Sequence, residues 1–557
     1  MTETRYIDSD LLIIGGGSAG CMAAIRALEI NPKLKVVIFE KGDIKYSGSI
    51  ARGMDALNVV VIPDITSPEL YVEAITGSCQ GVVDAFPSYE MARRSFGMLK
   101  KLEGWGVRFP KDEDGHYRTL KYHVKGRFQT AMEEPDLKVM ISRMAQEKGA
   151  LAVNRVMGLR LLENNGRVAG AVGLHVRTGE LIACRAGAVI LTAGGQARLS
   201  LPNSGYLYGT FDYPGNSGDG YNMAFRAGAS VTGMEYTDRS ILIKDANMPL
   251  LAITVTRGGR VMDICNKIIM ENECHSLGQM DQAVNEGRGP LRIKLSHLRP
   301  EIIDEIEGIL FSTERPVQER FFKGRGINFR KRDIELWPTE CQLCGGHGMS
   351  GVYVNEKAES DVSGLFAAGD VAAVPKQHLT GAFVFGEVAA EQAVDFISRE
   401  AETSFNDGQI RDVEEERNLR FSAAGRDIDV RELEYKVRRL IGDYVISPKN
   451  EYKLSRWMEW AERFRCEVQG QIAIRNAHEL SKLYEIENII ECACFSARAA
   501  MERKESRWGD AHHRTDFPDR DDRNFLCHMV LKQGPDPAEI NVTHKPVLTL
   551  DQKEMGR

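Results

Sequence analysis

The chain has 557 residues, which is too long for a single hydrophobic core and predicts about three to four domains, or one large domain with insertions. Apolar residues make up 43% and charged residues 27%, as in ordinary soluble proteins, which excludes the disordered, fibrous and membrane-spanning classes. The net charge of -7 offers no basic surface for a nucleic acid or an anionic lipid, so we expect neither as a partner.

The N-terminus and the cysteines both favour a cytoplasmic protein. Residues 1–10 lack the pattern of a secretory signal, and no apolar run reaches the length of about 18 residues that would give a membrane span. Eleven cysteines at irregular spacing favour reduced thiols. Cys341 and Cys344 form a CxxC pair, but a zinc or iron-sulfur site needs four ligands. We predict no metal site and interpret the pair as buried small residues, with a redox role left open.

Residues 11–40 have the pattern of a strand, a tight turn, a helix and a second, parallel strand. The apolar run Leu11–Ile14 leads into a glycine-rich turn and then into Cys21–Leu28, which has helical character. Asn31 and Pro32 end that helix, and residues 34–40 form the next strand. The chain therefore opens with a complete βαβ unit.

The glycine spacing in this unit predicts a dinucleotide site. Gly15, Gly17 and Gly20 match GxGxxG, in which the first glycine allows the turn, the second lets the backbone approach a diphosphate and the third lets helix and strand pack closely. The other loop residues are Gly16, Ser18 and Ala19. Because the helix begins here, its free N–H groups and partial positive charge face the phosphates.

An acidic residue at the end of the second strand strengthens this prediction. Glu40 can accept both hydroxyls of an adenosine ribose. The alternative is a glycine-rich turn that serves packing only. A second match to GxGxxG, at Gly346–Gly351, precedes a strand-like segment where a nucleotide fold would need a helix. A built-in NAD(P)H domain is therefore disfavoured, and any electrons for a redox reaction would have to come from another source.

The rest of the chain predicts an interrupted nucleotide domain. Helical spacing covers residues 67–104, a β-meander covers 168–176 and 180–185, and a buried strand covers 187–195. Residues 233 to 340 are richer in charge, with a helical stretch at 299–311, and we interpret them as an inserted cap. Strand and glycine patterns resume at 351 and at 364–370. Helices follow over 383–400 and after 405, and the tail from 503 is expected to be loop-rich.

The predicted fold class is α/β, with a discontinuous Rossmann-like dinucleotide-binding domain, an inserted α+β capping domain and a C-terminal helical domain. The expected boundaries are 1–232 and 345–405 for the nucleotide domain, 233–344 for the capping domain and 406–557 for the helical domain and tail.

Several spaced motifs carry a resemblance to a known family. They are Gly15–Gly20 with Glu40, Thr192–Gly195, Ser217–Gly220, Gly364–Asp370 and Arg503–Arg507. Together they resemble the flavoprotein-subunit superfamily of fumarate reductase, succinate dehydrogenase, aspartate oxidase and adenylylsulfate reductase. The nearer branch looks like the α subunit of adenylylsulfate reductase. The resemblance implies an FAD-dependent oxidoreductase.

The resemblance also implies the cofactor contacts. Asp370 would bind the ribityl chain, and the turn at Thr380–Ala382 would point N–H groups at the pyrimidine edge of the flavin. Gly48 stands where fumarate reductases carry a histidine bonded to FAD, so we predict non-covalent FAD. The implied contacts are Gly15, Gly17, Ser18, Ala19, Gly20, Glu40, Lys41, Ser47, Gly48, Ser49, Gly53, Ala193, Gly194, Asp219, Gly369, Asp370, Gly381 and Ala382.

Three residues are candidates for catalysis. His347 lies in a glycine-rich loop that the family places by the flavin, where an imidazole can move a proton. Arg507 lies beside Glu505 where the family brings its C-terminal domain over the active site; the alternative is an interdomain salt bridge. Arg257 would replace the family's cap arginine; the alternative is a turn between two strands. Leu242 stands where the adenylylsulfate branch has a substrate-binding arginine, which disfavours sulfate-nucleotide chemistry.

The expected reaction is two-electron transfer between the flavin and a small-molecule substrate that is polar or anionic. The electron donor or acceptor would be external, and the resemblance implies a ferredoxin-like iron-sulfur subunit as partner. One alternative is a self-contained reductase or oxidase without a partner. Another is a protein in which FAD is structural or serves RNA modification. Whether the chain forms an oligomer is left open.

Overall fold

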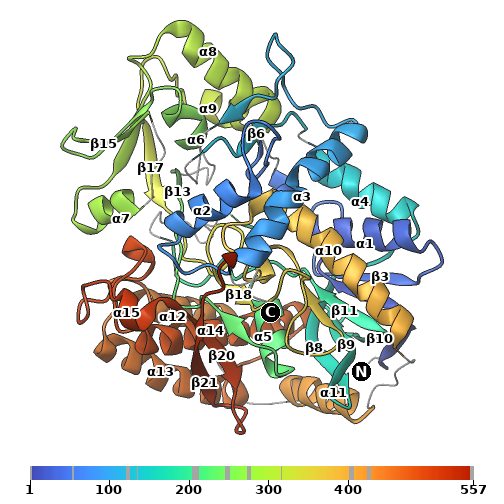
Figure 1. Cartoon of the computed structure of the whole chain (residues 1–557). Coiled ribbons are helices and arrows are strands. Elements are labelled where there is room, and N and C mark those ends of the chain that lie inside the picture. The colour runs from blue at the N-terminus through green and yellow to red at the C-terminus, as the bar shows by residue number, and fades with distance from the viewer. Residues whose placement is uncertain are drawn as a thin grey trace.

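The structure is a computed structural model that describes residues 3–52, 56–120, 126–134, 136–202, 212–244, 251–272, 278–314, 317–400, 407–422 and 428–551. Gly53, a predicted FAD contact, lies outside the described residues. The described chain forms two sheet layers flanked by helices, a separate lobe and a helical C-terminal region (Figure 1).

A five-stranded parallel sheet forms the centre of the nucleotide domain. Its order is β19-β11-β2-β3-β7, and every neighbouring pair is parallel. The strands are β2 (Leu11–Ile14), β3 (Val36–Glu40), β7 (Leu151–Asn154), β11 (Ala188–Leu191) and β19 (Leu365–Ala367). The central strands are apolar except for Glu40 at the end of β3, because both faces of the sheet are covered. β19 comes from a segment far along the chain, so the domain is discontinuous and the predicted fold class is confirmed.

Helices cover one face of this sheet and a second sheet covers the other. The helices are α1 (Ser18–Ile30), α4 (Leu137–Glu147) and α10 (His378–Arg399), with α2 (Pro68–Ser78) and α3 (Ala85–Gly104) beyond them. The second sheet has the order β1-β10-β9-β8, from β1 (Arg5–Asp8), β8 (Val156–Asn164), β9 (Arg167–His175) and β10 (Leu181–Arg185). α1 ends at Asn31 because Pro32 holds the preceding residue in an extended conformation.

The segment between β12 (Val231–Thr232) and β18 (Gly351–Val352) forms a lobe with its own core, at the upper left of Figure 1. Its antiparallel sheet has the order β13-β17-β16-β14-β15. The strands are β13 (Ile241–Ile243), β14 (Arg260–Met262), β15 (Ile268–Glu271), β16 (Leu291–Lys294) and β17 (Ile334–Pro338). The helices are α6 (Leu251–Val255), α7 (Gly278–Asn285), α8 (Pro300–Gly308) and α9 (Val317–Gly324), with a π-helical turn at Ile309–Glu314.

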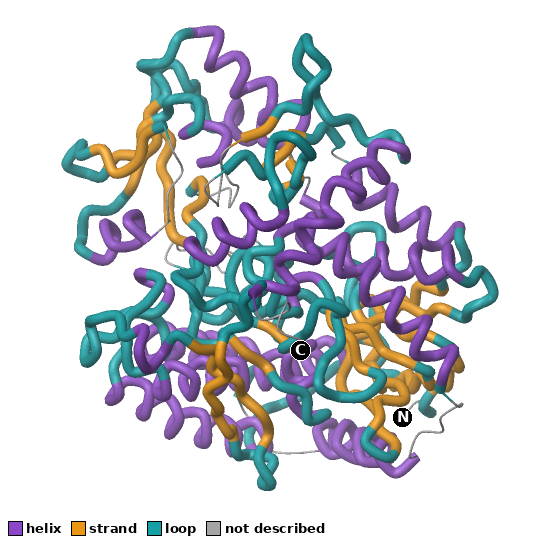
Figure 2. Tube along the Cα trace, in the orientation of Figure 1, coloured by secondary structure: helices purple, strands orange, loops and turns teal. Residues whose placement is uncertain are grey.

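The C-terminal region is mostly helical, as predicted, and Figure 2 shows its helices in the lower part of the molecule. The helices are α11 (Asp407–Ser422), α12 (Val430–Tyr444), α13 (Glu451–Gly470) and α14 (Ala477–Glu502). α12 buries Val430, Leu433, Val437 and Ile441, the apolar stripe expected of an amphipathic helix. None of the described helices is long and apolar enough to cross a bilayer.

The tail contains a β-hairpin that the sequence analysis missed. β20 (Cys527–Gln533) and β21 (Ile540–Pro546) pair with each other after a short helix, α15 (Asp522–Phe525). β20 also pairs with β12 (Val231–Thr232), which pairs with β18 (Gly351–Val352). The hairpin was not predicted because its central partner lies about 300 residues away and the flanking sequence is rich in charge.

The remaining elements are small. They are α5 (Asp219–Arg226), β4 (Ala56–Leu57), β5 (Thr119–Leu120), β6 (Gln129–Ala131) and the short 3-10 turns η1 (Ser49–Arg52), η3 (Gly369–Val371) and η4 (Gly509–Ala511).

Candidate functional site

The turn after β2 is closed so tightly that it requires glycine. Gly15 has φ +108°, and a Cβ there would lie 2.4 Å from the carbonyl oxygen of Thr192. A Cβ on Gly20 would lie 1.9 Å from the carbonyl oxygen of Gly15. The Thr192 hydroxyl donates to that same oxygen at 2.6 Å. The first and third glycines of the motif therefore have the packing roles predicted for them.

The second glycine lies at an open helix end. Gly17 is the N-cap residue of α1, no side chain caps the helix, and a Cβ on Gly17 would meet no atom within 4 Å. By helix geometry the N–H groups of Ser18, Ala19 and Gly20 have no intrahelical acceptor. These groups and the helix dipole together make a place for an anion such as a diphosphate.

Glu40 is buried at the end of β3, beside this loop. Its carboxylate accepts hydrogen bonds from the N–H groups of Gly16 at 2.8 Å and Gly42 at 2.6 Å. The two bonds hold the nucleotide loop and the segment after β3 against each other. Each carboxylate oxygen can accept a further bond, as a ribose hydroxyl would require.

Lys41 and Asp219, both predicted FAD contacts, pair with each other at 2.9 Å. Lys41 also pairs with Glu485 of α14 at 2.8 Å. Burial by itself would lower the pKa of Lys41, but Asp219 and Glu485 raise it, so the ammonium is charged. Burial would raise the pKa of Glu485, and the surrounding cations hold it well below its ordinary range. The structure thus brings Lys41 and Asp219 together in an ion network that joins the nucleotide domain to the helical region.

Four further segments converge on the start of α1. A Cβ on Gly48, whose φ is +82°, would lie 3.2 Å from Gly17 Cα. A Cβ on Gly369 of η3 would lie 3.0 Å from the Ala19 side chain. Ser49 donates to Asp212 at 3.0 Å. Ala193 and Gly194 follow β11, directly after the Thr192 that holds the loop.

These residues fit a flavin dinucleotide. Among the described residues, the buried Ser47 Oγ and Gln377 Oε1 have no hydrogen-bond partner within the protein, and they lie in the segments that would flank the flavin. Polar atoms that are buried without a partner are costly, so a polar ligand at this place would satisfy them. The uncapped helix end at Gly17 supports a diphosphate at the start of α1. The unpaired atoms of Ser47 and Gln377 support a polar ring system near η1 and α10.

The N-terminal end of α10 is one turn earlier than predicted. The helix begins at His378, so Gly381 lies within its first turn and its N–H donates to the Gln377 carbonyl at 2.8 Å. Ala382 lies one residue further into the helix. The N–H groups without an intrahelical acceptor at this end therefore include those of Leu379 and Thr380, in place of the two predicted residues.

The same helix end is joined to the loop that carries His347. Gln377 N donates to Gly345 O at 3.3 Å, and His378 N donates to Gly346 O at 3.1 Å. The rings of His347 and His378 meet edge to face with centroids 5.0 Å apart. His378 and Lys376 have φ of +49° and +51°, a left-handed conformation that is uncommon for residues other than glycine and that marks many functional sites. The sequence analysis missed His378, although its place beside the predicted flavin-edge turn was a signal.

Acidic side chains surround His347. Burial and the charge of Asp212 raise the pKa of Asp370, His347 lowers it, and the net result is a pKa of about 7. Burial also raises the pKa of Asp238, although the nearby charge of His347 lowers it. Asp238 accepts a hydrogen bond from Gln342 Nε2 at 3.0 Å. We call His347, His378, Asp212, Asp238 and Asp370 the His347 cluster. Asp212 and Asp238 belong to no motif, so no local signal could have found them.

Cys341 and Cys344 are both buried, and neither forms a disulfide. Burial raises the pKa of Cys344 well above its ordinary value, with nearby aspartates adding to the effect, so the thiol is protonated and unreactive. This supports the interpretation of the pair as buried small residues. Across the described residues, the one set with metal-ligand spacing is Asp112, Asp114 and His116, which are all exposed.

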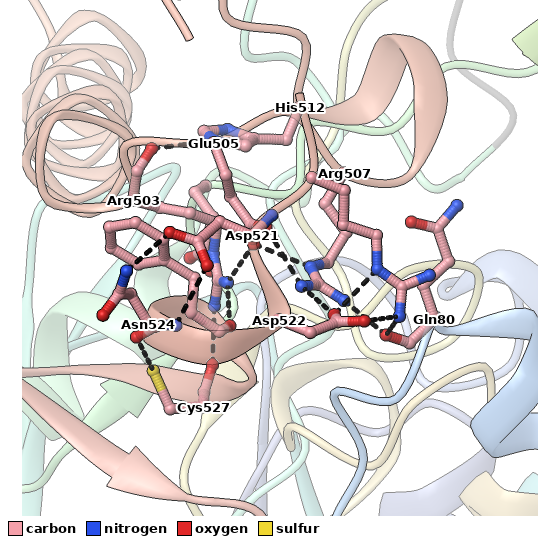
Figure 3. A network of polar contacts seen from close by, with 12 residues as sticks. Gln80, Arg503, Glu505, Arg507, His512, Asp521, Asp522, Asn524 and Cys527 are labelled. Atoms are coloured by element: carbon pink, nitrogen blue, oxygen red, sulfur yellow. Dashed lines mark hydrogen bonds and ion pairs between the residues drawn. The ribbon is translucent and has the colours of Figure 1, made fainter. Parts of the chain in front are cut away.

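Arg507 lies in a buried ion network (Figure 3). Its Nε donates to Glu505 at 2.7 Å, Nη1 donates to the Gln80 carbonyl at 2.5 Å, and Nη2 donates to Glu505 and Asp522. Glu505 also accepts from Arg503 at 2.8 Å. All three nitrogens of Arg507 thus bind the protein itself, which favours the salt-bridge interpretation, and we leave Arg507 out of the proposed catalytic group.

Replacing Glu505 by Gln is expected to lower the free energy of unfolding by about 3–5 kcal/mol, because two buried guanidinium groups lose their shared carboxylate. The exposed Glu502, at the end of the neighbouring helix, gives the matched control, and Glu502→Gln should change stability by less than about 1 kcal/mol. Urea unfolding followed by circular dichroism measures both. Equal, small effects of the two variants would contradict the assigned network.

Arg257 lies in the separate lobe, between α6 and β14. Residues 256–259 therefore form a helix-to-strand turn, and the expected turn between two strands is wrong. The guanidinium binds Glu305 of α8 at 3.0 Å and the Ile253 carbonyl at 3.0 Å. Both partners belong to the lobe itself, and α8 lies at its upper end in Figure 1, so these contacts hold Arg257 within the lobe.

Comparisons with known proteins agree with this geometry. A family model described as an FAD binding domain matches residues 10–382, and one described as the fumarate reductase flavoprotein C-terminal region matches residues 451–554. An uncharacterized FAD-dependent oxidoreductase of Methanocaldococcus jannaschii is 26% identical over 545 residues, which cover 92% of this chain and 94% of that protein. A fumarate reductase flavoprotein subunit of Serratia sp. is 25% identical, over 97% of this chain and 96% of that protein. The structure of adenylylsulfate reductase from Archaeoglobus fulgidus superposes with a TM-score of 0.87 at 23% identity. The superposition covers 98% of this chain and 97% of that chain.

Proposed function

Since the chain belongs to the FAD-binding domain family, with a fumarate reductase flavoprotein C-terminal region behind it, we propose a two-electron oxidoreductase that acts on a small polar or anionic substrate beside His347. Family membership confirms the predicted FAD cofactor and the oxidoreductase class. The observation that carries the proposal is the junction of the His347 loop with the α10 helix end and with Asp370.

The residues around the cofactor site have separate roles in this proposal. FAD, when bound, supplies the two-electron chemistry. Gly17 and the start of α1 would hold the diphosphate, Glu40 the ribose, and η3 with the first turn of α10 the flavin end. The partial positive charge at the start of α10 favours negative charge at that end. We also propose that the lobe of residues 233–344 helps to exclude water from this site.

The His347 cluster supplies proton chemistry in the proposal. His347 can donate to a substrate oxygen or move a proton, as a positioned imidazole does in general acid–base catalysis. Asp370, with a pKa of about 7, changes charge in the same range. His378 lies against His347 and supports the orientation of its ring.

We propose non-covalent FAD and an external electron partner. Gly48 has no side chain that could bond to a flavin. The Serratia relative is named as a flavoprotein subunit, which supports a second, electron-carrying subunit for this chain, and we propose a ferredoxin-like iron-sulfur protein. Denaturation should release all the yellow flavin into solution, and affinity purification from the native cell should yield an iron-containing protein. Flavin that stays with the denatured polypeptide would contradict the first of these proposals.

Anaerobic titration of the purified holoprotein tests the reaction. The flavin is first reduced with dithionite, and reoxidation is followed by absorbance as dicarboxylates, enoates and sulfur oxyanions are added separately; the oxidised flavin is titrated with the corresponding reduced compounds. We expect one class to change the flavin in stoichiometric amounts. If none of these small polar or anionic compounds changes it in either direction, the proposed substrate class is wrong.

The proposal predicts a pH dependence set by Asp370. Above about pH 7 its carboxyl group ionises and adds negative charge to the cluster, so kcat/KM for an anionic substrate should fall by up to about tenfold per pH unit. The Asp370→Asn variant should lose this inflection.

Stability provides an independent check on Asp370. Its folded pKa of about 7 lies above the ordinary value of 3.8, so the wild-type contribution to stability falls as the pH rises between these values. Asp370→Asn should therefore gain stability relative to the wild type over that range, measured by urea unfolding. A constant difference across the range would contradict the assigned pKa.

A further inference from the structure

A lysine outside the nucleotide motif lies directly under the nucleotide loop. Lys138 is the second residue of α4 and is only 2% exposed. Its ammonium group donates to the carbonyl oxygen of Gly16 and approaches Cys21 Sγ at 3.5 Å. α4 packs on both α1 and η1, the segments that would hold the two ends of the cofactor, and Figure 1 shows it beside α1.

This position is unfavourable for a lysine that only fills space. A buried ammonium group costs free energy unless its charge is compensated. None of the ion pairs found between described residues includes Lys138, whose bonds go to a neutral carbonyl and a thiol. The first turn of a helix disfavours cations, and the start of α1 adds a second positive helix end nearby. Glu40 supplies one negative charge at the same glycine, and a negatively charged ligand at the loop would also interact favourably with Lys138 and the two helix ends.

The bond to Gly16 also orients the peptide that faces the ligand. In a trans peptide, the Gly16 carbonyl and the Gly17 N–H point in opposite directions. Lys138 holds the carbonyl on the buried side, so the Gly17 N–H is turned towards the open side of the helix end. Glu40 fixes the other end of Gly16 through its N–H. Gly16 is therefore clamped from both sides by charged residues from two different elements.

We propose that Lys138 is a positioning residue for the diphosphate of FAD: it orients the Gly16–Gly17 peptide and supplies positive charge beneath the loop. The inference depends on FAD binding alone and not on the identity of the substrate.

The test measures FAD affinity without turnover. Holoprotein is diluted, and the fluorescence of released flavin gives Kd for the wild type, Lys138→Met and Lys148→Met. Lys148, partly exposed at the other end of α4, is the matched control. We expect Kd to rise about ten- to a hundredfold in Lys138→Met, because a charge-assisted hydrogen bond and its orienting effect are lost. Lys148→Met should bind like the wild type. An unchanged Kd in Lys138→Met would overturn the proposal.

Competition experiments separate this role from a general structural one. ADP carries the diphosphate and adenosine lacks it, so in Lys138→Met the inhibition constant of ADP against FAD rebinding should rise while that of adenosine stays the same. The thermal midpoint of the flavin-free protein should stay the same or increase, because an apolar side chain replaces an unpaired buried charge. Equal weakening of ADP and adenosine, or a lower midpoint, would overturn the proposal. Failure of the substrate titration would leave these results unaffected.

Discussion

Replacing His347 by Asn is expected to lower kcat about 100- to 10,000-fold, the range by which a positioned acid or base accelerates a reaction. Asparagine keeps a polar side chain of similar reach but cannot take up a proton. The flavin spectrum and FAD content should stay unchanged, because in our proposal the glycine loop at the start of α1 and Glu40 hold the diphosphate and the ribose of the cofactor. Steady-state kinetics with the substrate found by titration measure the effect, and KM should change much less than kcat.

Two controls make this result specific. His116→Asn alters an exposed histidine and should leave kcat unchanged. The His347 variant should also move the inflection of Asp370 to higher pH, because the imidazole lowers the pKa of that carboxyl group. Turnover within about twofold of the wild type would show that His347 is not the catalytic acid or base.

Replacing Gly20 by Ala is expected to abolish stable FAD binding, with Kd raised at least about a hundredfold. The new Cβ would lie 1.9 Å from the Gly15 carbonyl, so the loop must open and its N–H groups leave the diphosphate. The same clash should lower the free energy of unfolding by about 1–3 kcal/mol. The ratio of flavin to protein absorbance after gel filtration and urea unfolding measure the two effects.

Gly97→Ala is the matched control for this change. Gly97 lies exposed inside α3, and a Cβ there would meet no atom within 4 Å. Alanine should therefore stabilise the helix by about 0.5–1 kcal/mol and leave FAD content unchanged. A Gly20→Ala protein that retains its full flavin would contradict the packing role assigned to this glycine.

The site divides into residues that local sequence predicts and residues that it does not. The glycine loop is set by spacing within a few residues, and the structure has the predicted strand, turn and helix at the predicted places. Asp370 was implied by family resemblance and lies beside the His347 loop, where its backbone carbonyl accepts the Gly345 N–H. The resemblance also implied Lys41 and Asp219 as FAD contacts, but it did not predict that Lys41 pairs with Asp219 and Glu485.

Long-range contacts account for what the sequence analysis missed. Asp212 and Asp238 come from loops with no motif; Asp238 interacts electrostatically with His347, and Asp212 interacts with Asp238 and Asp370. The hairpin of β20 and β21 depends on pairing with β12, and Arg507 depends on Glu505 and the distant Gln80. Charge and burial at such positions are properties of the assembled structure.

By itself, the sequence determined the βαβ unit, the diphosphate turn and the family, because glycine conformation and apolar periodicity act over a few residues. Only the tertiary structure decided which charged groups face each other: Lys138 under Gly16, Lys41 with Asp219, and the carboxyl groups around His347. The physical reason is that the pKa and pairing of a buried group depend on neighbours that are distant in the chain, and the sequence does not specify their burial locally.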